Sequence, residues 1–174
     1  LVHVVGLGPS RIVQNLLAGV KITVLVVIIV LGFSVGDGVT GHFTLSNQPV
    51  SPELWLLALI PIMFSFSGWN AAAYVAEEIQ DPGRNVPLAM ALGTVVVVVI
   101  FLLLNLLYVY AMPINEIATV NVRVIDVAAG RLLGPQVAAP VAVASAVMIM
   151  ASISAMVMAG PRIYYAMARD GQFF

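Results

Sequence analysis

The sequence predicts an all-α membrane protein with four transmembrane helices. Of its 174 residues, 61% are hydrophobic and only 9% are charged, whereas soluble domains carry about 25% charged residues. The apolar residues gather in runs that reach the roughly 20 residues needed to cross the hydrocarbon layer as a helix. These runs lack the polar–apolar alternation that a membrane β-barrel requires in segments of about ten residues. Helices are therefore the expected spanning elements.

The first two predicted spans differ in how they carry polar groups. The first covers about residues 12–36 and contains one charged residue, Lys21, near its middle. The second covers about residues 54–76 and carries no charge, but residues that disfavour helix interrupt it near 65–70. In lipid every backbone N–H and C=O needs a partner, so such a break is tolerated only where it faces protein or a watery cavity.

The third and fourth spans are predicted at about residues 86–112 and 137–167. Asn85 is expected to cap the third span, with Pro87 in its first turn, where N–H groups lack intrahelical partners. The connection between the two spans leaves room for a short surface helix over residues 122–133. The charged side chains of this helix are expected to point to water; they are Arg123, Asp126 and Arg131.

The arginines in the loops predict the orientation of the chain. One side of the membrane would carry Arg11, Arg84, Arg162 and Arg169, and the other side Arg123 and Arg131. Because cytoplasmic loops are enriched in Lys and Arg, the first side is predicted to be the cytoplasmic one. The chain does not begin with Met and stops directly after a polar turn. We therefore expect a central piece of a larger, multi-pass protein of the cell membrane.

The composition and motifs argue against several classes of function. A formal net charge of −1 provides no basic footprint for nucleic acid, and the absence of cysteine removes thiolate chemistry and cysteine zinc sites. The two histidines, His3 and His42, have no metal-ligand spacing. The stretch Gly36–Gly41 fits the GxGxxG pattern, but a dinucleotide fold needs a short strand before it and a helix after it. We therefore expect no enzyme, no metal and no cofactor.

The interruption of the second span is the strongest candidate for a binding site. It combines small, polar and aromatic residues, namely Phe64, Ser65, Phe66, Ser67, Gly68, Trp69 and Asn70. The ends of half-helices carry partial charges of roughly half an electron, so freed carbonyls suit an ammonium group and freed N–H groups suit an anion. The alternative is a tightly packed helix crossing, since Ser and Gly also let helices approach closely.

Lys21 is the second candidate. A Lys deep in a span costs at least about 2.5 kcal/mol on insertion scales, so it needs a partner or a cavity. Ser152 and Ser154 of the fourth span are candidate partners. Two alternatives stay open: Lys21 reaches the inner headgroups along its own aliphatic stem, or each serine donates back to its own helix.

Several stretches of the chain resemble one superfamily of transporters, the amino acid–polyamine–organocation superfamily. The sequences FSFSGWN at 64–70, AEEI at 76–79 and DPGRNVP at 81–87 are similar to its sixth helix and the following loop. The sequence AGPRIYYAMARDG at 159–171 resembles the end of its eighth helix, and Val13, Gln14 and Lys21 resemble its fifth. The similarity covers nearly all of the chain and is closest to the L-type and cationic amino acid transporter branch.

The resemblance implies that the four spans are helices five to eight of about twelve in a LeuT-type inverted-repeat fold. The partners of the chain would then be the lipid bilayer, an amino acid substrate and the remaining helices of the parent transporter. The implied function is secondary active amino acid transport by alternating access, as an exchanger or a proton-coupled symporter. The alternative is a channel or pore-forming subunit, which would need a continuous polar stripe or charged ring; the sequence has neither.

The resemblance also implies roles for residues of the interrupted span. Phe64 matches an aromatic gate over the substrate, and Trp69 is expected to help close over it. The carbonyls of Phe64, Ser65 and Ser67 would receive the α-ammonium of the substrate, beside Gly68 in the same motif. Asn70 occupies a position that is acidic in some proton-sensing members of the family.

A second set of implied roles concerns coupling. Lys21 matches a fifth-helix Lys that replaces the bound cation of sodium-coupled relatives. Ser152 or Ser154 would lie near the second sodium site of those relatives. This set of residues is therefore expected to substitute for a cation site.

Overall fold

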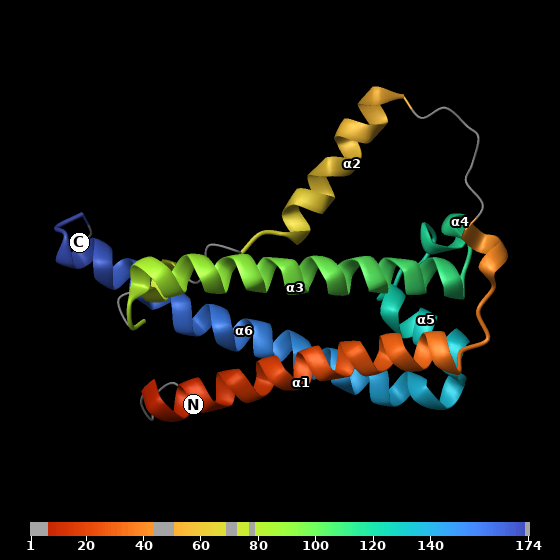
Figure 1. The fold of residues 1–174 in the computed structure, drawn as a ribbon, viewed down its shortest axis with the longest axis horizontal. Helices are drawn as coiled ribbons and strands as arrows, with labels where there is room; N and C mark the ends of the chain where they lie inside the picture. The colour runs from red at the N-terminus through yellow and green to blue at the C-terminus, as the bar shows by residue number, and fades with distance from the viewer. Residues whose placement is uncertain (1–6, 44–50, 69–72, 77–78, 173–174) are drawn as a thin grey trace. The chain divides into compact units, whose positions relative to one another are not determined.

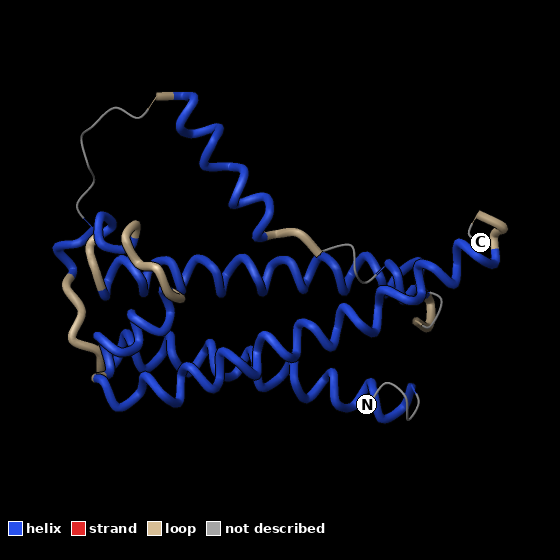
Figure 2. Tube along the Cα trace, turned by 180° about the vertical axis from the view of Figure 1, so that it is seen from behind, coloured by secondary structure: helices blue, strands red, loops and turns tan. Residues whose placement is uncertain are grey.

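The computed structural model describes residues 7–43, 51–68, 73–76 and 79–172. No strand occurs among these residues (Figure 2). The elements, labelled in Figure 1, are the helices α1 (Leu7–Ser34), α2 (Pro52–Ser65), α3 (Pro82–Ala111), α4 (Ile114–Ile117), α5 (Val124–Leu133) and α6 (Ala138–Arg169), with 3₁₀ helices η2 (Thr40–Phe43) and η4 (Pro135–Val137). The prediction of an all-α fold is confirmed.

Three of these segments are long and apolar enough to cross a membrane. They are Ile12–Ser34, Pro82–Ala111 and Pro135–Arg169. Helix α2 has 14 residues and is about 21 Å long at 1.5 Å per residue, which is less than the roughly 30 Å of the hydrocarbon layer. The second expected span is therefore not one continuous helix, because α2 ends at Ser65 and a turn follows at 66–68.

Two helices begin earlier than expected. Helix α1 starts at Leu7 instead of near residue 12, and α3 starts at Pro82 instead of near residue 86. The prediction that Asn85 caps α3 is wrong. Its N–H donates to the carbonyl of Asp81 at 3.0 Å, and its side-chain Nδ2 donates to the carbonyl of Gln80 at 2.6 Å. Pro82 suits the first helical position because its missing N–H has no intrahelical acceptor there.

The chain divides into two compact units. The first contains Leu1–Phe43 and Val98–Pro161, and the second contains Thr44–Val97 and Arg162–Phe174. The core of the first unit consists of Ile28, Leu107, Ala129, Leu132 and Val141. These residues come from α1, α3, α5 and α6, so the short helix α5 is the element on which three longer helices converge. Figure 1 shows α5 beside the C-terminal part of α1.

Glycines allow the close approach of α1 to α3 and α5. A Cβ added at Gly32 would lie 2.6 Å from Cδ1 of Leu107 and 3.3 Å from Cδ1 of Leu132. Leu107 itself is fully buried. Just beyond the end of α1, a Cβ at Gly38 would lie 2.2 Å from the ring of Tyr110. Side chains of α3 and α5 therefore lie directly against the main chain at these glycines. Larger residues at these positions would force the neighbouring side chains apart.

Hydrogen bonds attach the loop after α1 to the end of α3. The N–H of Val39 donates to the carbonyl of Tyr110 at 3.0 Å, and the hydroxyl of Tyr110 donates to the carbonyl of Gly36 at 3.4 Å. Nδ1 of His42 lies 3.2 Å from the carbonyl oxygen of Val109. These contacts satisfy carbonyls near the C-terminal ends of both helices, which have no intrahelical donor.

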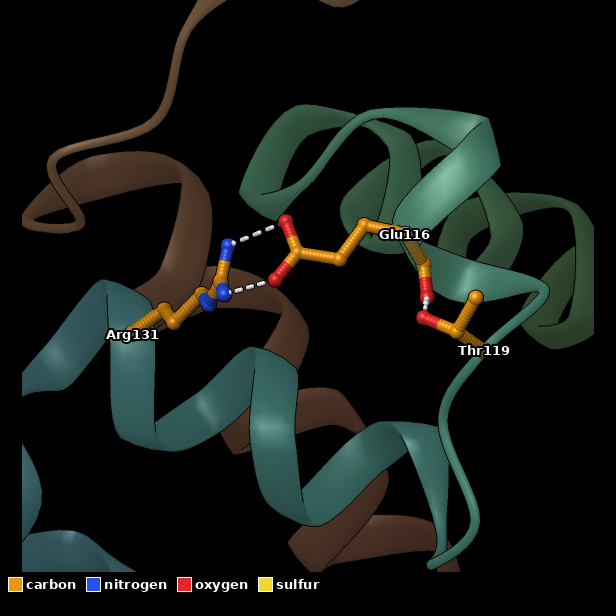
Figure 3. Close-up of polar contacts among 3 residues, drawn as sticks. All are labelled: Glu116, Thr119 and Arg131. Carbon is orange, nitrogen blue, oxygen red and sulfur yellow. Dashed lines mark hydrogen bonds and ion pairs between the residues drawn. The ribbon is translucent and has the colours of Figure 1, made fainter.

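Polar contacts hold α4 and α5 in place. The guanidinium of Arg131 donates to both carboxylate oxygens of Glu116, and Thr119 donates to the carbonyl of Glu116 at 2.8 Å (Figure 3). Such a two-pronged contact fixes orientation as well as distance. Arg131 therefore joins α5 to the short helix α4.

Asp126 is not directed to water as expected. Its side chain is only 20% exposed. One carboxylate oxygen accepts from Nε of Arg123 at 2.9 Å, and the other accepts from the hydroxyl of Ser145 on α6 at 3.2 Å. Ser145 is 4% exposed. The prediction of a short helix is right, since α5 covers Val124–Leu133, but one face of it packs onto the longer helices.

The close packing of α1 generates a prediction about stability. Gly32→Leu is expected to destabilise the fold by about 1–3 kcal/mol, because the new side chain overlaps Leu107 and Leu132. Gly19→Leu on the same helix is the matched control, because nothing lies within 4 Å of its added Cβ. The measurement is thermal unfolding of the purified protein in detergent. Equal unfolding temperatures for the two variants would contradict the packing described for α1.

Candidate functional site

The first candidate site is the turn that ends α2. The N–H of Phe66 donates to the carbonyl of Ile62 at 3.3 Å, and the N–H of Ser67 donates to the carbonyl of Phe64 at 3.0 Å. The spacing of these bonds shortens from four residues to three, which tightens the last turn. Gly68 then takes a positive φ of 92°, a conformation that glycine adopts at no steric cost. The regular hydrogen-bond ladder therefore stops within three residues.

The local sequence explains why the helix ends here. Pro61 lies inside α2 and has no N–H for the ladder. The hydroxyl of Ser65 donates to the carbonyl of Pro61 at 2.8 Å, a serine contact that often bends helices. Ser67 and Gly68 follow, and glycine costs about 1 kcal/mol relative to alanine inside a helix. Ser67 and Gly68 make continuation of the helix beyond Ser65 less favourable, and Pro61 weakens the ladder one turn earlier.

A hollow of about 600 Å³ lies beside this turn, within the second unit. Its lining residues come from the turn and from one face of α3, and they are Ser65, Phe66, Ser67, Gly68, Ala89, Met90, Gly93, Thr94 and Val97. Pockets of about 300–1,000 Å³ lined mainly by apolar groups with a few polar ones are typical of small-molecule sites. The hydroxyl of Thr94 donates to the carbonyl of Met90 at 2.8 Å, so it is already engaged within its own helix.

The structure brings together part of the predicted set. Ser65, Ser67 and Gly68 line the hollow. Phe64 precedes them on α2, and its side chain is 80% exposed. Trp69 and Asn70 lie outside the described residues. The role of each of these residues in binding therefore stays a prediction.

The wall formed by α3 was not predicted from the sequence. Ala89, Gly93 and Val97 lie four residues apart, so they share one face of the helix. The spacing of these residues in the sequence could have indicated this face of α3. It was missed because apolar runs in a membrane helix leave the lipid-facing and protein-facing sides hard to distinguish.

The second candidate site joins α1 to α6 within the first unit. Nζ of Lys21 donates to the hydroxyl oxygen of Ser152 at 2.8 Å. The hydroxyl of Ser152 in turn donates to the carbonyl of Met148 at 3.1 Å. The sequence left open whether Ser152 bonds to its own helix or to Lys21. In the structure it does both, since it donates to the carbonyl of Met148 and accepts from Lys21.

Ser154, the other proposed partner, occupies a different face of α6. Two residues apart on a helix of 3.6 residues per turn is a rotation of about 200°, so Ser152 and Ser154 cannot both point at Lys21. Ser154 is half-buried and has contacts of its own. The geometry selects Ser152 as the partner of Lys21.

Metal binding finds no support among the described residues. No group of three or more His, Cys, Asp or Glu side chains there is arranged to hold an ion.

Comparison with known proteins identifies the family. The amino acid permease family matches residues 1–174. The chain is 27% identical over 172 residues to the serine/threonine exchanger SteT of Bacillus subtilis (strain 168), which covers 99% of this chain and 39% of the exchanger. It is 32% identical over 108 residues to the b(0,+)-type amino acid transporter 1 of Oryctolagus cuniculus, covering 60% of this chain and 22% of that protein.

A third relative is the Asc-type amino acid transporter 1 of Mus musculus, 31% identical over 117 residues, covering 63% of this chain and 22% of that protein. The chain thus spans less than half the length of the curated relatives it matches. No solved structure gives a significant match. The family is one of transporters and not of enzymes, and three apolar helices of membrane length agree with it. The chain belongs to the amino acid permease family and is a multi-pass membrane protein.

Proposed function

We propose that the chain is the central part of a secondary active amino acid transporter of the cell membrane, which works by alternating access. The observation that carries this proposal is the end of α2 at Ser65, where an apolar helix stops short of membrane length and opens onto a hollow. Irregular backbone at membrane depth is tolerated where it lines a cavity, and transporters hold their substrates at such breaks. Membership of the amino acid permease family also supports amino acid transport.

The charged head of the substrate would bind at the turn. The C-terminal end of a helix carries about half a negative charge, which favours the α-ammonium group of an amino acid. The carbonyls of Phe64, Ser65 and Ser67 are the proposed acceptors. The carbonyl of Phe64 already accepts the N–H of Ser67, but a carbonyl oxygen has a second lone pair for a further donor. Asn70 would add an amide to the same site.

The aromatic residues would close the site. The ring of Phe64 is largely exposed at the last turn of α2, so few contacts with the described residues restrain its rotamer. Closure of Phe64, together with Trp69, would exclude water from the bound ammonium. Excluding water strengthens the electrostatic contacts inside the site.

Lys21 would act as a fixed cation in the coupling region. Its contact with Ser152 ties α1 to α6 by a charge-assisted hydrogen bond. A tethered ammonium at this place would supply the positive charge that a bound ion provides in relatives coupled to sodium. The name of the Bacillus relative, a serine/threonine exchanger, supports exchange, and a pH gradient in the assay distinguishes exchange from proton symport.

The direct test is uptake of labelled amino acids by the full-length parent in proteoliposomes, with and without internal amino acid and a pH gradient. Phe64→Ala is expected to reduce uptake at least tenfold while insertion is unchanged, because the gate over the substrate is lost. Met63→Ala, an exposed neighbour on α2, is the matched control and should transport normally. Normal uptake by Phe64→Ala would remove the gate assignment, and a parent that takes up no amino acid would overturn the proposed function.

Lys21→Ala should reduce uptake at least tenfold, and Ser152→Ala should reduce it more than Ser154→Ala, because Lys21 contacts Ser152. The double variant Lys21→Ala with Ser152→Ala should be no worse than Lys21→Ala alone, since residues that act through one contact have non-additive effects. The measurement is initial uptake rate at equal amounts of reconstituted protein. Additive losses would show that the two residues act independently.

Gly68→Ala tests the backbone at the turn. Alanine in a left-handed conformation costs roughly 1–2 kcal/mol, so the turn should shift and the apparent affinity for substrate should fall by about tenfold. Gly83→Ala is the control, because Gly83 lies in α3 without a positive φ and nothing surrounds its added Cβ. An unchanged half-saturation constant for Gly68→Ala would argue that the conformation of this turn does not matter for binding.

A further inference from the structure

A second hollow, of about 370 Å³, lies within the second unit beside the C-terminal end of α6. Its polar lining comes from the segment after the turn and from α6 and its end, and consists of Tyr74, Arg162, Tyr165, Asp170 and Gln172. Apolar residues, among them Ile163 and Met167, form the rest of the wall. Five of the ten lining residues are polar or charged, and clefts of about 300–1,000 Å³ whose polar groups fix the orientation of a ligand are typical of small-molecule sites.

The charges of this lining have both signs. The guanidinium of Arg162 has five N–H donors, so it can hold a carboxylate in addition to its contacts within the protein. The carboxylate of Asp170 is an acceptor only, and suits an ammonium group. A simple anion would be repelled by Asp170 and a simple cation by Arg162. A small zwitterion satisfies both charges at once.

The backbone at the end of α6 fixes the acidic side of this hollow. The N–H of Gly171 donates to the carbonyl of Ala168 at 3.1 Å, and the N–H of Gln172 donates to the carbonyl of Met167 at 2.9 Å. Gly171 has a positive φ of 68°. This combination is the Schellman helix end, and it sets the positions of Asp170 and Gln172 without a ligand. The main chain on this side of the hollow is therefore preorganised by its own hydrogen bonds.

The chain itself connects the two hollows. Gly68 borders the first hollow and Ala73 borders the second. Five residues of extended chain reach at most about 18 Å, so Gly68 and Ala73 lie within that distance of each other. The second hollow lies on the side of Arg162 and Arg169, which the loop arginines predict to be cytoplasmic.

We propose that the hollow formed by Tyr74, Arg162, Tyr165, Asp170 and Gln172 is a second binding site for the amino acid zwitterion, occupied on the cytoplasmic side of the transport path. Arg162 receives the α-carboxylate and Asp170 the α-ammonium. This inference rests on the proposed function and adds a second substrate-binding site between the turn of α2 and the cytoplasm.

The test uses the full-length parent in proteoliposomes of known orientation, with exchange of a labelled amino acid measured from each side while the opposite side is saturated. Asp170→Asn is expected to raise the half-saturation constant at the cytoplasmic side five- to tenfold and to leave the external one unchanged. Asp170→Glu, which keeps the charge, should restore most of the affinity. Asp37→Asn is the matched control, an exposed carboxylate outside both hollows, and should change neither constant.

Each outcome decides between the two proposals. If the Asp170→Asn variant exchanges amino acids with the same half-saturation constants as the unsubstituted parent, the second site is overturned and the proposed function stays intact. Equal changes at both sides also overturn it, because they indicate a general structural effect. A parent without amino acid exchange overturns the proposed function itself.

Discussion

The need of every main-chain N–H and C=O for a partner in lipid is the constraint on which the rest of this structure depends. Three apolar helices of membrane length meet it along most of their hydrogen-bond ladders. Helix α2 does not, because its ladder tightens at Ser67 and stops at Gly68. A chain that ends a helix in this way inside an apolar sequence needs another donor or acceptor at that point. The hollow beside the turn is where a substrate would supply it.

The first unit has a different task, which is to hold long helices in a fixed arrangement. Membrane helices gain little from hydrophobic association, since lipid is as apolar as their side chains. Close packing and polar contacts take over this role here. Because Gly32 has no side chain, Leu107 and Leu132 lie directly against the main chain of α1. Asp126 on α5 accepts a hydrogen bond from the buried Ser145 of α6. The contact between Lys21 and Ser152 adds a charged link between α1 and α6.

Much of this could be predicted from the sequence, and the failures have physical causes. The helix break was predictable because Ser67 and Gly68 are poor helix formers in an otherwise apolar run. The contact of Lys21 with α6 was predictable because a Lys within a membrane span needs a partner, but the choice of Ser152 over Ser154 depends on helix rotation. The start of α3 was misplaced because Pro82 is a better first residue than the sequence pattern around Asn85 suggested. Side-chain burial was the least predictable property, since Asp126 packs against α6 through contacts that no local pattern records.

The central claim is that the main chain at the end of α2 binds the ammonium group of an amino acid. The most direct measurement is a structure of the full-length parent with a bound amino acid. The account predicts the substrate nitrogen within about 3 Å of main-chain oxygens at residues 64–67, which is hydrogen-bond distance, with the helix interrupted at Gly68. A continuous α-helix through these residues, with the substrate nitrogen bound elsewhere, would contradict it.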